Sequence, residues 1–230
     1  MNIVSRLVLF FLSLLFSLAY VLLVISVGVR LVMTPLFLFV EYYRIGFPLD
    51  FYGFSVSDRL FYSSQVLTYL LENRSDGYLT SLSLDSNGSL FNDREIVHMI
   101  DVNVLSKMFF GIVLFVFILL IISIIFSKFY LTMRSFIRKS IELGCYITLG
   151  LILLIVTGAI VSWEAFFSGF HQLFFTENTW IFEYSDSLIR LFPEQFWFDA
   201  AILVGGIAVL LALFTLWIIL RLPYWSSKPQ

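Results

Sequence analysis

Chemically versatile side chains are scarce in this sequence of 230 residues: charged residues make up 13% of it, and it has two histidines and one cysteine. With Cys145 alone, the chain cannot form an internal disulfide, a CxxC redox motif or a cysteine-based zinc site. The net charge of −2 gives no basic excess to neutralise phosphates, which argues against a nucleic-acid partner. Hydrophobic residues make up 60% of the chain, and this composition predicts a membrane protein.

Four apolar runs are predicted to cross the membrane as helices, at residues 7–29, 108–127, 144–161 and 200–220. Each has about 18–23 residues, and at about 1.5 Å per residue this length matches a hydrocarbon core. None of the runs contains Asp, Glu, Lys, Arg or His. Because pumps and ion-coupled carriers need ionisable groups at membrane depth, a transport function is disfavoured.

The basic residues predict which ends of these helices face the cytoplasm. Seven of the 14 Lys and Arg residues lie in the short segments 1–6, 128–143 and 221–230, where only Glu142 opposes them. Short connections rich in Lys and Arg stay inside the cell. Both termini are therefore expected to be cytoplasmic.

The two long connections, 30–107 and 162–199, contain the other fifteen of the 16 acidic residues and are expected outside. Residues 80–91 alternate in polarity around Asn87-Gly88, which predicts a two-residue hairpin turn. The predicted fold is an all-α polytopic membrane protein, one integral membrane domain over residues 1–230. It has four transmembrane helices and an extracellular cap of short helices with a small β-hairpin.

The first histidine follows a signal for the start of a helix. Residues 92–95, Asn-Asp-Arg-Glu, have the capping-box pattern, so a helix is predicted from here through His98 towards the second span. Arg94, Glu95, His98 and Asp101 share one face of this helix. This face is either a solvated surface with ordinary ion pairs or a polar stripe in which Glu95 and Asp101 flank a functional imidazole.

The second histidine lies in a strongly aromatic segment. A helix there places Phe167, Phe174 and Phe175 around His171, and Phe170 adds to the wall. An exposed helix would not carry so many aromatic rings, so the cap or lipid must cover it. The segment is either an interfacial aromatic belt with His171 as its polar handle, or one side of a pocket.

Asp186 and Arg190 lie four residues apart further along the chain, and this spacing predicts an ion pair within one helix.

No metal or other cofactor is expected. A haem held by two histidines would need them inside the spans, and zinc would need more ligands than the sequence brings near them. There is no G-x-S-x-G motif and no accessible cysteine nucleophile. The chemistry left to two imidazoles at a lipid–water boundary is acid–base catalysis on a lipid-linked substrate that supplies its own nucleophile.

Two stretches, NDREIVHMIDVNVL (92–105) and FSGFHQLFFTENTWIFEYSDSLIRLFPEQFW (167–197), together resemble the signatures of the bacterial lipoprotein intramolecular transacylases. The resemblance extends over nearly the whole chain. It implies a multi-pass protein of the bacterial cell membrane with its active site at the outer face. Members of this family move the sn-2 acyl chain of a diacylglyceryl-modified N-terminal cysteine onto the α-amino group of that cysteine, which gives a lyso-form lipoprotein. The catalytic histidines of the family fall on His98 and His171.

The resemblance implies a diacylated lipoprotein as substrate and membrane lipid as surroundings. One histidine is expected to activate the amine, and the other to stabilise the oxyanion or to protonate the leaving oxygen, with the order left open. Arg94 is expected to contact a polar substrate group, and Glu95 or Asp101 to orient His98. Aromatic side chains are expected to exclude water around the substrate: Phe167, Phe170, Phe174, Phe175 and Trp180.

Two other functions compete with this interpretation. A non-enzymatic membrane scaffold or accessory protein would tolerate the loss of both histidines. A phospholipid acyl hydrolase or acyltransferase would act on free phospholipid without any lipoprotein.

Overall fold

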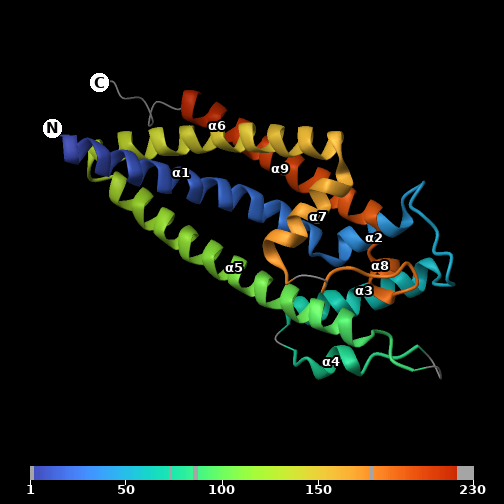
Figure 1. The fold of residues 1–230 in the computed structure, drawn as a ribbon. Helices are drawn as coiled ribbons and strands as arrows, with labels where there is room; N and C mark the ends of the chain where they lie inside the picture. The colour runs from blue at the N-terminus through green and yellow to red at the C-terminus, as the bar shows by residue number, and fades with distance from the viewer. Residues whose placement is uncertain (1–2, 73, 85–87, 177–178, 222–230) are drawn as a thin grey trace. The chain divides into compact units, whose positions relative to one another are not determined.

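The computed structural model describes residues 3–72, 74–84, 88–176 and 179–221, and this part of the chain is helical (Figure 1). Its helices are α1 (Ile3–Val32), α2 (Pro35–Tyr43), α3 (Val56–Leu71), α4 (Gly77–Thr80), α5 (Asp93–Ser127), α6 (Leu131–Val161), α7 (Trp163–Phe174), α8 (Ser187–Leu191) and α9 (Glu194–Arg221). By length and composition α1, α5, α6 and α9 can each cross a membrane. The predicted all-α fold with four candidate spans is therefore confirmed.

The predicted β-hairpin at residues 80–91 is wrong. Among the described residues there is no strand. One isolated antiparallel bridge joins Ser83 and Ser89, and backbone hydrogen bonds run from the Leu84 N–H to the Gly88 carbonyl and from the Leu90 N–H to the Leu82 carbonyl. The start of the segment belongs to α4, whose Leu79 is fully buried in a helical core. The segment thus turns back on itself through a few backbone hydrogen bonds and packs against helices, but it does not form strands. Asn87, half of the predicted turn, lies outside the described residues.

The chain divides into two compact units rather than one. The first comprises Met1–Val29, Phe110–Val161 and Val204–Gln230, and the second comprises Arg30–Phe109 and Ser162–Leu203. The second unit thus contains the short helices together with the first turns of α5 and α9. Its location outside the membrane stays a prediction.

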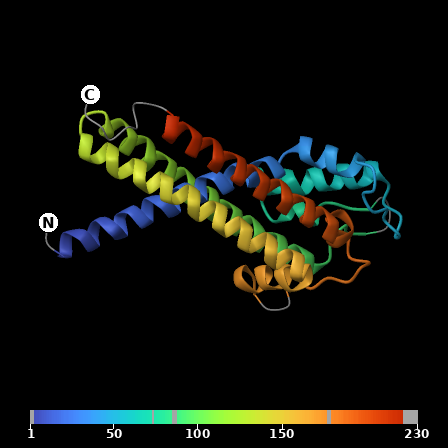
Figure 2. The same cartoon turned by 90° about the horizontal axis from the view of Figure 1, so that it is seen from above.

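Small residues let the helices of the first unit pack closely. A Cβ atom on Gly28 of α1 would lie 2.7 Å from the Cα of Val204 in α9, and one on Gly144 of α6 would lie 2.9 Å from the carbonyl oxygen of Ser17 in α1. The Ser17 hydroxyl donates to the Ser140 carbonyl at 2.7 Å. Within this unit α6 and α9 also lie side by side (Figure 2). Close backbones and hydroxyl hydrogen bonds are the usual means of holding helices together in lipid.

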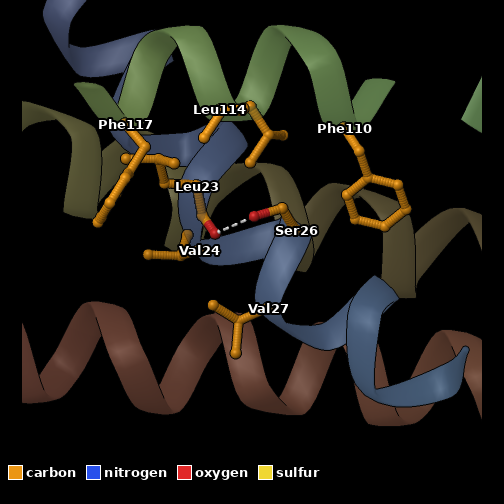
Figure 3. Close-up of a pocket in the computed structure, with 8 residues that line it drawn as sticks. Leu23, Val24, Ser26, Val27, Phe110, Leu114 and Phe117 are labelled. Carbon is orange, nitrogen blue, oxygen red and sulfur yellow. Dashed lines mark hydrogen bonds between the residues drawn. The ribbon is translucent and has the colours of Figure 1, made fainter. Parts of the chain in front are cut away.

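An apolar cavity of about 450 Å³ lies between α1 and α5 in the first unit (Figure 3). Ser26 is the polar residue among those that line it, and its hydroxyl donates to the Leu23 carbonyl of its own helix at 2.7 Å. With that hydroxyl already paired, the cavity lining provides no group for acid–base chemistry.

The second unit has its own core, which fixes the first turns of α5. Side chains from α3, α4, α5 and α8 form it, among them Tyr69, Leu79, Met99 and Leu191. The Asn103 side-chain amide of α5 donates to the Tyr69 carbonyl of α3 at 3.0 Å. Because Met99 and Asn103 point into this core, the neighbouring His98 is held at a defined position.

Candidate functional site

The two histidines of the chain come together in the second unit. His98 lies near the start of α5 and His171 in the last turn of α7, with their ring centroids 6.1 Å apart and their planes inclined by 26°. Two van der Waals contacts in series would need about 7 Å, so no further layer of atoms fits between the ring faces. A reacting group can therefore approach the pair only at the ring edges.

The capping box at the start of α5 forms as predicted. The Asn92 N–H donates to Glu95 Oε2 at 2.7 Å, and the Glu95 N–H donates to Asn92 Oδ1 at 3.0 Å. These reciprocal bonds give acceptors to the backbone N–H groups of Asn92 and Glu95 at the start of the helix. They fix the turn that carries His98.

Aromatic rings surround both imidazoles. Four of the predicted wall residues pack on His171, by centroid distance: Phe167 at 4.2 Å, Trp180 at 5.0 Å, Phe175 at 5.5 Å and Phe170 at 5.6 Å. Phe175 also lies 4.7 Å from the His98 ring, so it contacts both histidines. The pair thus lies in an apolar environment.

One predicted wall residue lies elsewhere, and an unpredicted one takes part. Phe174 packs on Phe170 at 4.9 Å, is 46% exposed, and makes no ring contact with either histidine. Phe182 instead lies edge-on to His98 at 5.4 Å. It belongs to the irregular stretch between α7 and α8, where no helical periodicity indicates the direction of a side chain.

A backbone hydrogen bond fixes the tautomer of His171. Its Nδ1 lies 2.7 Å from the carbonyl oxygen of Phe167, one helical turn earlier. Because a carbonyl oxygen only accepts, Nδ1 carries the hydrogen and Nε2 keeps its lone pair. Burial lowers the pKa of His171 below its ordinary 6.5, and the bond to Phe167 partly opposes this shift. At neutral pH the ring is therefore an uncharged base with Nε2 available.

Two polar atoms at the site lack partners. His98 is 6% exposed, and within the described ranges its buried Nδ1 makes no hydrogen bond. The buried indole Nε1–H of Trp180 also has no acceptor among the described residues. Buried polar atoms in proteins are nearly always paired. An unpaired nitrogen on each of two rings beside His171 therefore marks places where a substrate atom can bind.

The predicted carboxylates do not orient His98. Glu95 is buried, and its two oxygens accept the backbone N–H groups of Asn92 and of Leu188 in α8. Glu95 thus joins the starts of two helices. No hydrogen bond links Asp101 to His98, although both residues are described.

The predicted ion pair between Asp186 and Arg190 is wrong. Asp186 accepts from Arg94 of α5 at 2.7 Å, and Arg190 pairs with Asp50 at 2.9 Å. Long-range partners replace the local one because each side chain meets an opposite charge from another element. Arg94, predicted to bind substrate, is thereby engaged with Asp186 and lies over the Phe182 ring at 6.0 Å.

The geometry suits proton transfer better than metal binding. In the described part of the chain no three His, Cys, Asp or Glu side chains converge. Two imidazoles alone are fewer protein ligands than zinc sites provide. What the site offers is a neutral base, an unpaired ring nitrogen and an unpaired N–H donor, all among aromatic rings.

Comparison with known proteins identifies the fold and the family. The chain resembles the solved structure of the membrane integral lipoprotein intramolecular transacylase Lit from Bacillus cereus, with a TM-score of 0.73, 18% identity, and coverage of 92% of this chain and 94% of that one. An uncharacterized protein of Aquifex aeolicus (strain VF5) is 30% identical over 194 residues, which cover 84% of this chain and 86% of that protein. The family model described as lipoprotein intramolecular transacylase Lit matches residues 11–197. This multi-pass membrane protein therefore belongs to the lipoprotein intramolecular transacylase family.

Proposed function

We propose that this protein moves the sn-2 acyl chain of a diacylglyceryl-modified N-terminal cysteine onto the α-amino group of the same cysteine. The observation that carries the proposal is the pair of histidine rings, 6.1 Å apart among aromatic side chains. In the reaction a C–N bond forms and the ester C–O bond breaks. The protonated amine first loses one proton to solvent; the neutral amine then gives up one proton on attack, and one proton reaches the glycerol oxygen, so no co-substrate is consumed.

His171 is the general base in this proposal. The α-amine has a pKa of about 7.7–8 and is mostly protonated at neutral pH, so its attack on the ester requires loss of protons. Nε2 of His171 has a free lone pair because Nδ1–H donates to Phe167. General acid–base catalysis of this kind contributes about 10²–10⁴ to a rate.

His98 and Trp180 act on the oxygens. The indole N–H of Trp180 is a donor without an acceptor and serves the oxyanion of the tetrahedral intermediate. The proton that Nε2 of His171 takes from the amine is the one returned to the departing glycerol oxygen, and this balances the step. Burial lowers the pKa of His98 to about 4, so its neutral ring acts beside His171 as a hydrogen-bond donor to that oxygen. Because donor and acceptor groups belong to one substrate molecule, the enzyme need only fold that molecule so that they meet, and effective molarities of about 10⁵ M or more become available.

The aromatic rings protect the ester. Water in the site would compete with the amine and release a free fatty acid. Phe167, Phe175 and Trp180 occupy the space around His171 and limit the access of water to it. In this proposal the second unit is the extracellular cap, the site lies at the outer face of the membrane, and both termini are cytoplasmic.

The test uses a bacterial strain that lacks lipoprotein N-acylation and expresses the full chain. The reaction is an isomerisation, so the intact mass of the lipoprotein does not change. Fragmentation spectra of its N-terminal peptide must instead show the acyl chain on nitrogen, and the amine must stop reacting with amine-specific reagents. His98→Asn and His171→Asn should abolish both changes, whereas Gln172→Ala, an exposed neighbour on α7, should retain them.

Two results would reject the proposal. If either histidine variant, inserted at normal levels, still produces N-acylated lipoprotein, the site has been misidentified. If the wild-type chain leaves the lipoprotein unchanged but releases fatty acid from phospholipid, the protein is a phospholipid hydrolase.

A further inference from the structure

Another cavity, which has polar side chains in its lining, lies in the second unit at the start of α3. Its volume is about 190 Å³, well above the ~15 Å³ that one water needs. The loop between α2 and α3 and the first turn of α3 line it, with Phe47, Leu49, Asp50 and Arg59 among the lining residues. Its lining residues include neither histidine nor any of the rings that pack on them, so the cavity is distinct from the acyl-transfer site.

Arg59 is buried in this cavity with most of its donors unused. The residue is 4% exposed, and with the described residues it makes one hydrogen bond, from Nη1 to the Pro48 carbonyl at 2.6 Å. Its Nε is buried without a partner among the described residues. A guanidinium has five N–H donors, and burying a charge is costly unless it is paired and hydrogen-bonded. The cavity therefore lacks an acceptor that Arg59 requires.

The nearby acidic groups do not provide that acceptor. Asp50 is held by Arg190 at 2.9 Å and accepts the Phe54 N–H at 2.7 Å. Asp58 caps the start of α3 through Ser55 and lies on its exposed side. Glu41 is paired with Arg44, whose guanidinium lies over the same Phe47 ring as that of Arg59. Asp50 thus attracts the Arg59 charge from within the cavity but accepts no hydrogen bond from it, so the acceptor for Nε is left for a ligand to supply.

The rim of the cavity indicates the source of this ligand. Apolar side chains of the loop point into open space: Ile45 is 100% exposed, Phe51 96% and Leu49 76%. Gly46 and Gly53 have φ angles of 84° and 106°, a left-handed conformation that favours glycine and shapes the loop. Exposed apolar side chains near a buried cation suit an amphipathic ligand, with one anionic group and apolar chains attached to it.

We propose that this cavity binds the phosphate group of a membrane phospholipid. The phosphate oxygens accept from the unused N–H groups of Arg59, since a guanidinium matches phosphate geometry. Leu49 and Phe51 contact the glycerol and acyl part of the same lipid. The site holds the loop against the membrane surface and takes no part in acyl transfer.

The experiment measures binding to the full-length protein in a neutral detergent by native mass spectrometry and by the shift in Tm. Dioctanoyl phosphatidylglycerol is the probe, dioctanoylglycerol is the matched lipid without phosphate, and inorganic phosphate is the matched anion without chains. The phospholipid should bind more tightly than either. Arg59→Gln should weaken its binding about tenfold or more, because charge-assisted hydrogen bonds are lost.

Two variants control for folding and for charge. Arg74→Gln removes an exposed arginine of the same unit and should leave the affinity unchanged. Phe51→Ser alters a 96% exposed side chain, so this variant folds. It should weaken the binding of the phospholipid but not the binding of inorganic phosphate. If Arg59→Gln does not fold, Phe51→Ser decides alone.

Several outcomes would overturn the proposal. Inorganic phosphate binding as tightly as the phospholipid would assign a soluble anion, and dioctanoylglycerol binding as tightly would remove the role of the phosphate. If folded Arg59→Gln or Phe51→Ser binds the phospholipid as tightly as the wild type, the cavity is not a phospholipid site and holds water.

Discussion

Glu95 carries the sharpest prediction about the integrity of the site, because its two oxygens are used by two backbone donors. In Glu95→Ala the Leu188 N–H, buried at the start of α8, loses its acceptor at a cost of about 1–3 kcal/mol, and the partly buried Asn92 N–H loses about 1 kcal/mol. The sum is about 2–4 kcal/mol. At about 2–4 °C per kcal/mol for a chain of this size, the Tm should fall by about 4–16 °C.

The assay is thermal unfolding of the purified protein in detergent, followed by tryptophan fluorescence. Asp93→Ala is the matched control, since Asp93 is an exposed acidic residue in the same first turn of α5. It should change the Tm by little. Glu95→Gln keeps one side-chain oxygen, so its Tm should lie between those of Glu95→Ala and Asp93→Ala. A Tm for Glu95→Ala equal to that of Asp93→Ala would show that the two backbone bonds contribute nothing, and the reasoning would fail.

Three further predictions concern the second unit. An NMR titration of labelled histidine should give His171 a midpoint below 6.5, because burial lowers its pKa. Transfer should slow as the pH falls below neutral, first because the amine becomes more fully protonated and then because His171 protonates. A His171 midpoint at or above 6.5 would contradict this prediction. Arg190→Gln leaves Asp50 buried without its partner, and the free energy of unfolding should fall by about 3–5 kcal/mol in denaturant titrations; an unchanged midpoint would refute the ion pair. Phe175→Ala removes the ring that contacts both histidines, so fatty-acid release should rise relative to N-acylation in lipid analysis; an unaltered ratio would show that water is excluded by other means.

The sequence predicts the spans and the capping box because both are local patterns. A run of apolar residues long enough to cross a bilayer has few alternatives, and the reciprocal bonds of Asn92 and Glu95 need only four consecutive residues. That His98 and His171 meet was predicted through resemblance to a family, since no local pattern joins α5 to α7.

Most errors of prediction concern partners distant in the chain. Spacing predicts Asp186 as the partner of Arg190, yet its partner Asp50 precedes it by 140 residues. Helical periodicity places Glu95 on the His98 face but does not show that the Leu188 N–H donates to its carboxyl group. The predicted hairpin also did not take into account that Leu82 and Leu84 pack against a helical core.

The bond from His171 to the Phe167 carbonyl has an evolutionary consequence. In many acid–base sites a neighbouring acidic side chain selects the tautomer, and one mutation there destroys the selection. Here the main chain does this, and every amino acid at position 167 brings the same oxygen. The orientation of the proposed base is thus inherited with the helix itself, and drift among the surrounding side chains leaves it in place.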